Sequence, residues 1–306
     1  MAPSSDIAPA LAPAAAVHMP LRGILLMLLA VFLFVIMDAT GKALTADYNI
    51  WQISWARYLF HLAILPLFFR RQSVATVLRT SRLNLQLLRS ALMLGSTVFF
   101  FAAVSYIPLA EATAIGFVSP LLVAAFSVPL LGEKVGPRRW AAVIVGFLAV
   151  MLIIRPGFGM IHWAYLLPLG SAVCFALYQI TTRILSRYDS SVTTLAHSVS
   201  VGLLVTTIVV LIPGQWRNPD LQGWMLMILV GAVGGIAHYI LIRALTLAPA
   251  ALLAPFVYLQ LVWAAIVGFV WFGDVPGWST LGGTAVLAAS GLYVMYRERK
   301  AAQAPG

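Results

Sequence analysis

Ten long apolar runs follow one another along this chain, and they limit what it can fold into. They cover residues 21–42, 51–69, 84–104, 108–131, 138–154, 161–183, 192–212, 223–243, 248–272 and 277–296. In an α-helix each residue rises 1.5 Å, so about 20 residues span the hydrocarbon layer of a bilayer, which is about 30 Å thick. The links between the runs are too short for a separate soluble domain. The sequence therefore predicts an all-α integral membrane protein with ten transmembrane helices.

The composition excludes the other common classes. Hydrophobic residues make up 62% and charged residues only 9% of the 306 residues, and the mean hydropathy is +0.97. Soluble domains carry about a quarter charged residues. A membrane β-barrel would show alternating segments of about 10 residues, whereas these runs are continuously apolar. A helix also satisfies its own backbone polar groups in lipid, so helices are the spanning elements we expect.

The basic residues are distributed asymmetrically about the predicted membrane. A net charge of +10 would suit nucleic-acid binding in a soluble protein. Here fifteen of the 19 Lys and Arg residues fall on the side of the N-terminus, three on the other side, and Arg57 inside the second run. The fifteen are Arg22, Arg70, Arg71, Arg79, Arg82, Arg89, Lys134, Arg138, Arg139, Arg183, Arg187, Arg243, Arg297, Arg299 and Lys300. The positive-inside rule then predicts a bacterial cytoplasmic (inner) membrane protein with both termini cytoplasmic and no nucleic-acid partner.

The chain repeats itself at a constant offset of 141 residues. The alignment needs no gaps and pairs identical residues: Phe34 with Phe175, Thr40 with Thr181, Pro108 with Pro249, Gly132 with Gly273. The two copies occupy 21–155 and 161–297, between a disordered tail at 1–20 and a short tail at 298–306. Each copy holds five runs, an odd number, so the second copy enters the membrane from the opposite side. We therefore expect two inverted five-helix repeats, an architecture shared by many alternating-access transporters.

The ends of the two copies carry a more specific pattern. In each copy a helix that begins near a proline leads into a turn, Leu-Leu-Gly-Glu at 130–133 and Trp-Phe-Gly-Asp at 271–274, and a final helix rich in small residues follows. This pattern resembles the two EamA domains of the drug/metabolite transporter superfamily. The chain is similar to bacterial ten-helix carriers that include exporters of aromatic and other amino acids. The resemblance implies a central cavity lined by the first, third, fourth, sixth, eighth and ninth helices.

Side chains near the middle of the runs are candidates for solute binding. Ser119 and Gln260 are repeat mates, and polar groups at this depth tend to face a cavity or a partner because their burial in lipid is costly. Contact with solute and hydrogen bonding between helices both stay open for them. Aromatic and donor groups nearby suit a planar solute, although core packing explains each one singly. These further candidates are Phe117, Val118, Phe256, Tyr258, Trp263, Tyr178, Gln179, His238 and Tyr239.

Charged residues and prolines mark candidate gate or coupling positions. Asp38 and Lys42 stand four apart in the first run, where the simplest account is an i,i+4 ion pair and the alternative is a role in the cavity or gate. Glu111 follows Pro108 by three residues, and an acid in a first helical turn is favoured by the helix dipole. A gate or proton site is the alternative for Glu111. Pro108 and Pro249 begin the fourth and ninth runs at matching places.

Two prolines and two histidines complete the polar inventory of the runs. Pro120 and Pro255 each remove a helix hydrogen bond, which produces either a packing kink or carbonyls bent toward a cavity. His61 and His197 lie in the second and seventh runs, outside the cavity implied by the resemblance, and we assign them structural roles.

Motifs for other chemistry are missing from the sequence. It contains no phosphate loop, HExxH, paired Cys-x-x-Cys or G-x-S-x-G motif, so we expect no catalytic residues, no metal site and no cofactor. The small residues of Gly231–Gly235 fit helix packing within one bundle as well as between subunits, which leaves a homodimer undetermined.

These observations lead to a function with two alternatives. The leading hypothesis is a secondary transporter that exports amino acids, aromatic or other neutral ones, or related small metabolites by alternating access. A carrier of nucleotide-derived or cofactor-like solutes or of drugs is the first alternative. A membrane-embedded enzyme or structural subunit is the second, and the inverted repeat argues against it.

Overall fold

The computed structural model describes residues 19–68, 77–132, 136–155 and 163–302. Nearly all of the predicted N-terminal tail, and the turn residues Glu133 and Lys134, fall outside these ranges. Within them the regular elements are all helical. They are α1 (Pro20–Leu44), α2 (Ile50–Phe68), α4 (Leu83–Val104), α5 (Leu109–Gly116), α6 (Ser119–Leu131), α7 (Pro137–Ile154), the 3-10 turn η1 (Trp163–Tyr165), α8 (Leu166–Leu185), α9 (Ser191–Val210), α10 (Leu221–Leu247), α11 (Ala250–Val257), α12 (Leu259–Phe272) and α13 (Trp278–Ala302).

The apolar character of these helices agrees with a membrane fold, so the predicted fold class is confirmed. Seven segments in the described ranges are long and apolar enough to cross a bilayer alone, and Trp140–Ile154 of α7 is a shorter apolar helix. The 19-residue helix α2 is more polar, because it carries Gln52, Arg57 and His61. All three side chains are buried, which shields them from lipid.

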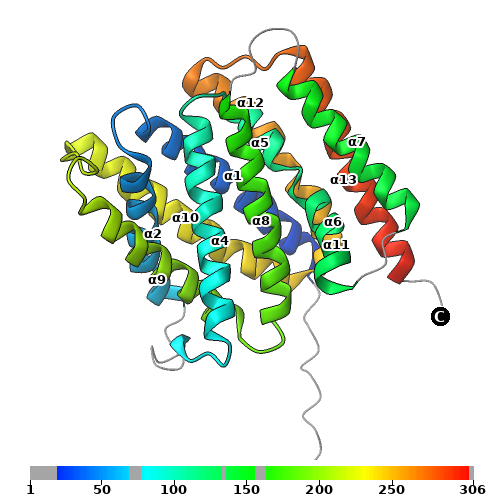
Figure 1. Ribbon diagram of the computed structural model, residues 1–306, viewed down its shortest axis with the longest axis horizontal. Coiled ribbons are helices and arrows are strands. Elements are labelled where there is room, and N and C mark those ends of the chain that lie inside the picture. Colours follow the sequence, from blue (N-terminus) through cyan, green and yellow to red (C-terminus); the bar gives the residue numbers. More distant parts are fainter. Residues whose placement is uncertain (1–18, 69–76, 133–135, 156–162, 303–306) are drawn as a thin grey trace, which may run out of the picture.

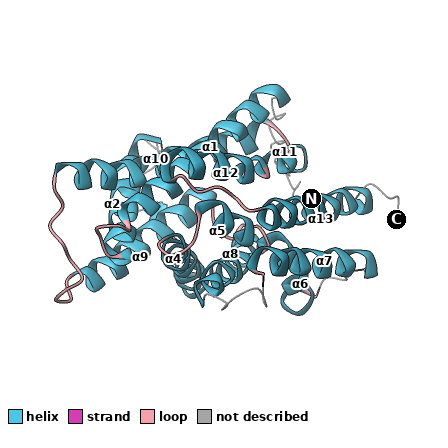
Figure 2. Cartoon of the chain, turned by 90° about the horizontal axis from the view of Figure 1, so that it is seen from above, coloured by secondary structure: helices cyan, strands magenta, loops and turns pink. Residues whose placement is uncertain are grey.

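The helices pack in pairs that the sequence repeat relates to one another. At an offset of 141 residues α1 corresponds to α8 and α4 to α10. α1 packs along α10, and α4 packs along α8, so one contact occurs twice with the partners drawn from opposite repeats. α2 packs on its own mate α9, and α7 on its mate α13. Figures 1 and 2 show α7 and α13 side by side at one end of the bundle and α2, α9 and α10 at the other.

Both of the predicted runs 108–131 and 248–272 form two helices in place of one. In the first, α5 ends at Gly116 and α6 begins at Ser119. Pro120 has no N–H, so the Gly116 carbonyl cannot receive the i+4 bond of a continuous helix. The Val118 carbonyl instead accepts the backbone N–H groups of Leu121 and Leu122 at 2.9 and 3.0 Å.

The second break lies between α11 and α12 at Tyr258, the repeat mate of Phe117. Its proline, Pro255, stands three residues before the break, whereas Pro120 follows the first one. The breaks therefore occur at equivalent positions although the prolines do not.

Close helix contact inside the bundle depends on small residues. A Cβ on Gly41 of α1 would overlap the ring of Phe101 on α4, and Phe101 is fully buried. The surrounding core includes Val35, Ile53 and Met227 from α1, α2 and α10. This contact holds α1 and α4 together where the polar interior begins.

Candidate functional site

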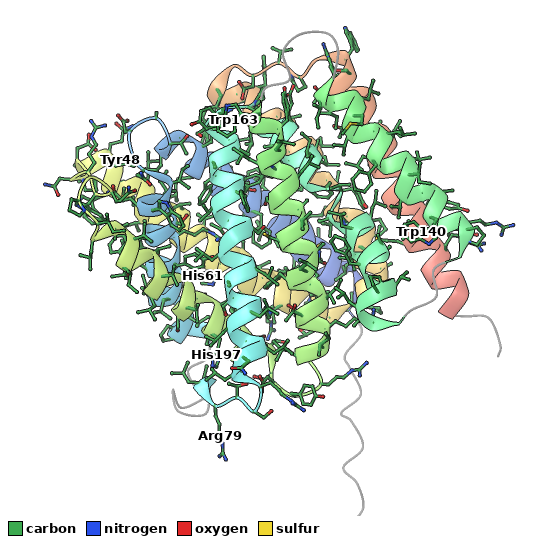
Figure 3. All side chains as sticks on the ribbon, viewed as in Figure 1. Tyr48, His61, Arg79, Trp140, Trp163 and His197 are labelled. Atoms are coloured by element: carbon green, nitrogen blue, oxygen red, sulfur yellow. The ribbon has the colours of Figure 1, made fainter. Side chains whose placement is uncertain are left out.

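The polar contacts of the molecule lie at two ends and in the interior. Figure 3 shows Trp163 and Tyr48 toward one end, and Arg79 and His197 toward the other. We name them the Trp163 end and the Arg79 end.

An ion pair between the two repeats lies at the Trp163 end. Lys42 Nζ is 2.6 Å from Asp274 Oδ2 and donates a second hydrogen bond, 3.4 Å long, to the Ile107 carbonyl. The ammonium group also lies 4.8 Å from the centre of the Phe272 ring. Lys42 thus links the end of α1 to the end of α12 and to the chain before α5. These side chains are mostly buried, which makes the charge-assisted bond stronger than an exposed pair.

The predicted i,i+4 pair between Asp38 and Lys42 is wrong. Lys42 pairs with Asp274, 232 residues away, because its long side chain reaches across to the end of α12. Asp38 lies one turn deeper, is 8% exposed, and interacts electrostatically with Arg57 of α2.

Glu111 connects three elements at the same end. It stands in the first turn of α5, as the sequence predicts. The Tyr165 hydroxyl donates to Glu111 Oε2 at 2.7 Å, and the Thr280 hydroxyl donates to Oε1 at 3.1 Å. The carboxylate therefore joins α5 to η1 and α13. Pro108, the residue before α5, and Pro249, the residue before α11, begin their helices at equivalent places.

The two helix breaks meet on the axis that relates the repeats. The rings of Phe117 and Tyr258 lie 5.3 Å apart, and these residues are repeat mates. Two mates in contact must lie on either side of the pseudo-two-fold axis. The predicted solute-binding residues Val118, Ser119 and Gln260 lie next to the same breaks.

Ser119 and Gln260 differ in their surroundings. Ser119 is 5% exposed at the start of α6, and Gln260 is half-buried at the start of α12. Among the described residues no hydrogen bond joins either side chain to another helix. The structure therefore offers no support for the interhelical hydrogen bond that was one of the two interpretations.

The aromatic candidates are divided between two regions. Trp263 packs edge-on against Phe32 of α1 at 5.1 Å, and Phe256 packs against the cluster around Met27. His238 lies edge-on to Phe34 at 4.8 Å, and Tyr178 lies in the interior near Arg89. Gln179 and Tyr239 are half-buried on α8 and α10. The candidate residues thus do not form one continuous lining.

A buried group of arginines and hydroxyls was missed by the sequence analysis. Arg89 is 3% exposed and makes four hydrogen bonds: Nε donates to Thr182 Oγ1 (2.7 Å), Nη1 to the Thr194 carbonyl (2.7 Å) and to Ser198 Oγ (2.6 Å), and Nη2 to Tyr178 Oη (2.7 Å). Its assignment to a basic loop is therefore wrong. Its position inside the run 84–104 was the signal, since an arginine within a membrane helix faces the interior.

A second buried arginine stands beside this network. Arg57 is 5% exposed, and its Nη1 donates to Thr97 Oγ1 at 2.6 Å. The residues around it enclose a cavity of about 10 Å³, to which Arg57, His61, Tyr178, Ser198 and His238 contribute. We call Arg57, His61, Arg89, Tyr178, Ser198 and His238 the arginine cluster.

His61 belongs to this cluster and not only to the helix core assigned to it from the sequence. Its ring centre lies 5.2 Å from that of His238. His197, in contrast, bonds to the Thr193 carbonyl of its own helix at 2.9 Å, in keeping with a structural role. No group of three or more His, Cys, Asp or Glu side chains in the described ranges is arranged to hold a metal ion.

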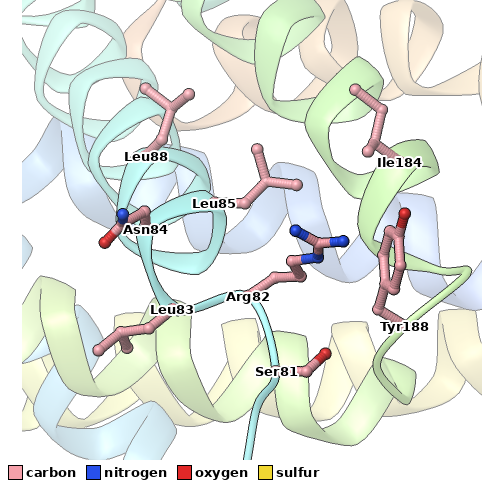
Figure 4. Close-up of a pocket in the computed structure, with 8 residues that line it drawn as sticks. All are labelled: Ser81, Arg82, Leu83, Asn84, Leu85, Leu88, Ile184 and Tyr188. Carbon is pink, nitrogen blue, oxygen red and sulfur yellow. The ribbon is translucent and has the colours of Figure 1, made fainter.

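A larger surface depression lies at the Arg79 end, between the start of α4 and the end of α8. Figure 4 shows its lining side chains, among them Arg82, Leu88 and Tyr188. Its volume is about 640 Å³. Arg82 lies 4.7 Å from the Tyr188 ring centre, and Leu88 is 52% exposed. The depression is therefore open to the surroundings of the protein and separate from the helix breaks.

Comparison with known proteins places the chain among membrane carriers. It is 28% identical over 288 residues to a riboflavin transporter of Vibrio cholerae, covering 92% of this chain and 96% of the relative. It is 28% identical over 267 residues to an S-adenosylmethionine uptake transporter of Rickettsia bellii, covering 86% and 90%. It is 27% identical over 273 residues to a pseudopaline exporter of Pseudomonas aeruginosa, covering 88% and 94%.

The fold and the family agree with these relatives. A solved crystal structure has a TM-score of 0.63 at 17% identity and covers 90% of this chain and 98% of that chain, which shows the shared fold. The model of the EamA-like transporter family matches this chain twice, over residues 21–155 and 162–297. The chain therefore belongs to the EamA-like transporter family, as a multi-pass membrane protein with two EamA domains.

Proposed function

We propose that this chain is a secondary transporter that carries one small organic metabolite past the two helix breaks by alternating access. The observation that carries the proposal is the contact of Phe117 with Tyr258, which puts two interrupted helices of opposite repeats face to face on the pseudo-two-fold axis. Interrupted helices at a repeat interface are where inverted-repeat carriers bind solute, because the breaks leave backbone groups free for it.

The relatives favour a cofactor-like solute over an amino acid. Amino-acid export was the first expectation from the sequence, and no relative described above is named for an amino acid. Riboflavin and S-adenosylmethionine both contain a planar heterocycle, which suits the aromatic side chains Phe117, Tyr258 and Trp263. We therefore place cofactor-like heterocyclic solutes first and aromatic amino acids second. The relatives include both uptake and export carriers, so flux is to be measured in both directions.

A proteoliposome assay with matched variants tests this proposal. Purified full-length protein is reconstituted and assayed for counterflow of labelled riboflavin, S-adenosylmethionine and tryptophan. Ser119→Leu and Gln260→Leu fill the space beside the breaks, so we expect flux to fall while the melting temperature stays near the wild-type value. Ser105→Leu, at an exposed position after α4, is the control. Normal flux in both Leu variants would contradict this location, and loss of folding would point to a packing role.

Coupling and location complete the proposal. We place the protein in the cytoplasmic membrane with both termini inside, on the distribution of its basic residues. Asp38 and Glu111 are the carboxylates buried or half-buried within the pathway helices. If protons drive transport, Asp38→Asn or Glu111→Gln abolishes accumulation of solute under a pH gradient. Accumulation that persists in the double variant rules out coupling through these carboxylates.

A further inference from the structure

The arginine cluster contains more positive charge than the protein around it balances. Arginine stays charged in proteins, and Arg57 and Arg89 are both buried at mid-depth in the helix bundle. Asp38 is the carboxylate that interacts electrostatically with Arg57. The four acceptors of Arg89 are neutral hydroxyl and carbonyl oxygens. One positive charge is therefore left over even when Asp38 is ionised.

Two donor atoms that line the cavity lack a partner. Arg57 Nε and His61 Nε2 are fully buried and make no hydrogen bond within the described structure. Buried polar atoms of this kind normally have a partner because losing water without one is costly. Both residues line the cavity together with Tyr178 and Ser198. The unpartnered nitrogens, the surplus charge and the cavity thus coincide.

The cavity also lies on the pseudo-two-fold axis. Arg57 and Ser198 are repeat mates, 141 residues apart, and both line it. Thr97, which accepts a hydrogen bond from Arg57, is the mate of His238. A cavity formed by mates from both repeats changes shape whenever the repeats move relative to each other. Its volume of about 10 Å³ is close to the space one water needs, so the structure holds it nearly closed.

We propose that the arginine cluster binds a carboxylate group of the transported solute. Guanidinium groups match the geometry of a carboxylate with two parallel hydrogen bonds. Arg57 would supply its free Nε–H, while the hydroxyls of Tyr178 and Ser198, now bonded to Arg89, would reorient toward the second oxygen. The solute class is then an anionic or zwitterionic metabolite whose carboxylate reaches this cluster. This inference rests on the proposed transport function, which it makes more specific.

The test measures binding on the purified full-length protein in detergent, with benzoate as the carboxylate probe. Benzamide has the same shape without the charge. At constant ionic strength we expect benzoate to raise the melting temperature saturably, by about 3 °C at ten times its dissociation constant, and benzamide to leave it unchanged. In Arg57→Gln the benzoate shift is lost. In Arg82→Gln, a surface arginine that lies against a tyrosine, the shift is retained.

A second pair of variants keeps the test decisive if Arg57→Gln fails to fold. Ser198 Oγ lies 2.6 Å from Arg89 Nη1, so Ser198→Asp places an internal carboxylate in the cluster. We expect Ser198→Asp to melt at a higher temperature than wild type and to lose the benzoate shift. Ser198→Asn, its neutral counterpart, retains the shift.

Four results would overturn the inference: no shift with benzoate in wild type, equal shifts with benzoate and benzamide, an undiminished shift in Ser198→Asp, or an equal shift with chloride alone, which would indicate an inorganic-anion site. The flux assay separates this inference from the function on which it rests. Solute flux without a specific benzoate effect refutes the carboxylate site and leaves the transporter assignment intact. A specific benzoate effect without flux of any solute does the reverse.

Discussion

At the scale of single residues, the ion pair of Lys42 with Asp274 joins the two repeats at the Trp163 end. Lys42→Ala leaves Asp274 without its partner, and we expect a loss of about 2 kcal/mol of stability. The charge-swapped double variant, Lys42→Asp with Asp274→Lys, is expected to recover part of this loss. Thermal denaturation of the four proteins gives the coupling energy. Additive effects of the two single changes would show that the pair contributes nothing.

Gly41 gives a second prediction at this scale. An added Cβ would overlap the buried Phe101 ring, so Gly41→Ala is expected to cost about 1–3 kcal/mol through overpacking of α1 against α4. Gly282→Ala on α13 is the matched control, because its Cβ would meet only Leu152, at an ordinary 3.9 Å. We expect the melting temperature to fall in the first variant and not in the second. Equal stability of both variants would mean that α1 and α4 can separate without cost.

At the scale of elements, the two helix breaks occur at equivalent positions while their prolines do not. We infer that packing between Phe117 and Tyr258, and not proline alone, maintains the breaks. Pro120→Ala and Pro255→Ala should therefore transport near the wild-type rate, as should Pro66→Ala, a control in the last turn of α2. Phe117→Ala with Tyr258→Ala should show a coupling of about 1 kcal/mol in a thermal double-mutant cycle. Loss of flux in the Pro120 or Pro255 variant alone would assign the breaks to proline.

At the scale of the whole molecule, the inverted repeat and the basic residues predict which end faces the cytoplasm. In a Cys174→Ser background, a cysteine at Arg79 should react with an impermeant maleimide only from the cytoplasmic side. A cysteine at Arg217, which lies in the loop before α10 and has a 66% exposed side chain, should react only from the opposite side. Labelling of intact cells and of inverted vesicles gives the two readings. Modification of Arg79→Cys in intact cells would reverse the topology.

The sequence by itself determined the class of this protein. Its apolar runs, the constant offset of 141 residues and the paired turns pointed to helices, an inverted repeat and a transporter family, because each is a pattern within or between linear segments. Fixed spacing also marked Glu111 as the acid in the first turn of a helix and Phe117 and Tyr258 as equivalent positions.

Only the tertiary structure decided which side chains meet. Lys42 contacts Asp274 and not Asp38, and Arg89 is buried and not in a loop, because both depend on contacts between segments about a hundred or more residues apart. Periodicity reports how a helix faces its surroundings but not which helix faces it. The arginine cluster draws on five helices from both repeats, so no local pattern could show that its two unpartnered nitrogens line the same cavity.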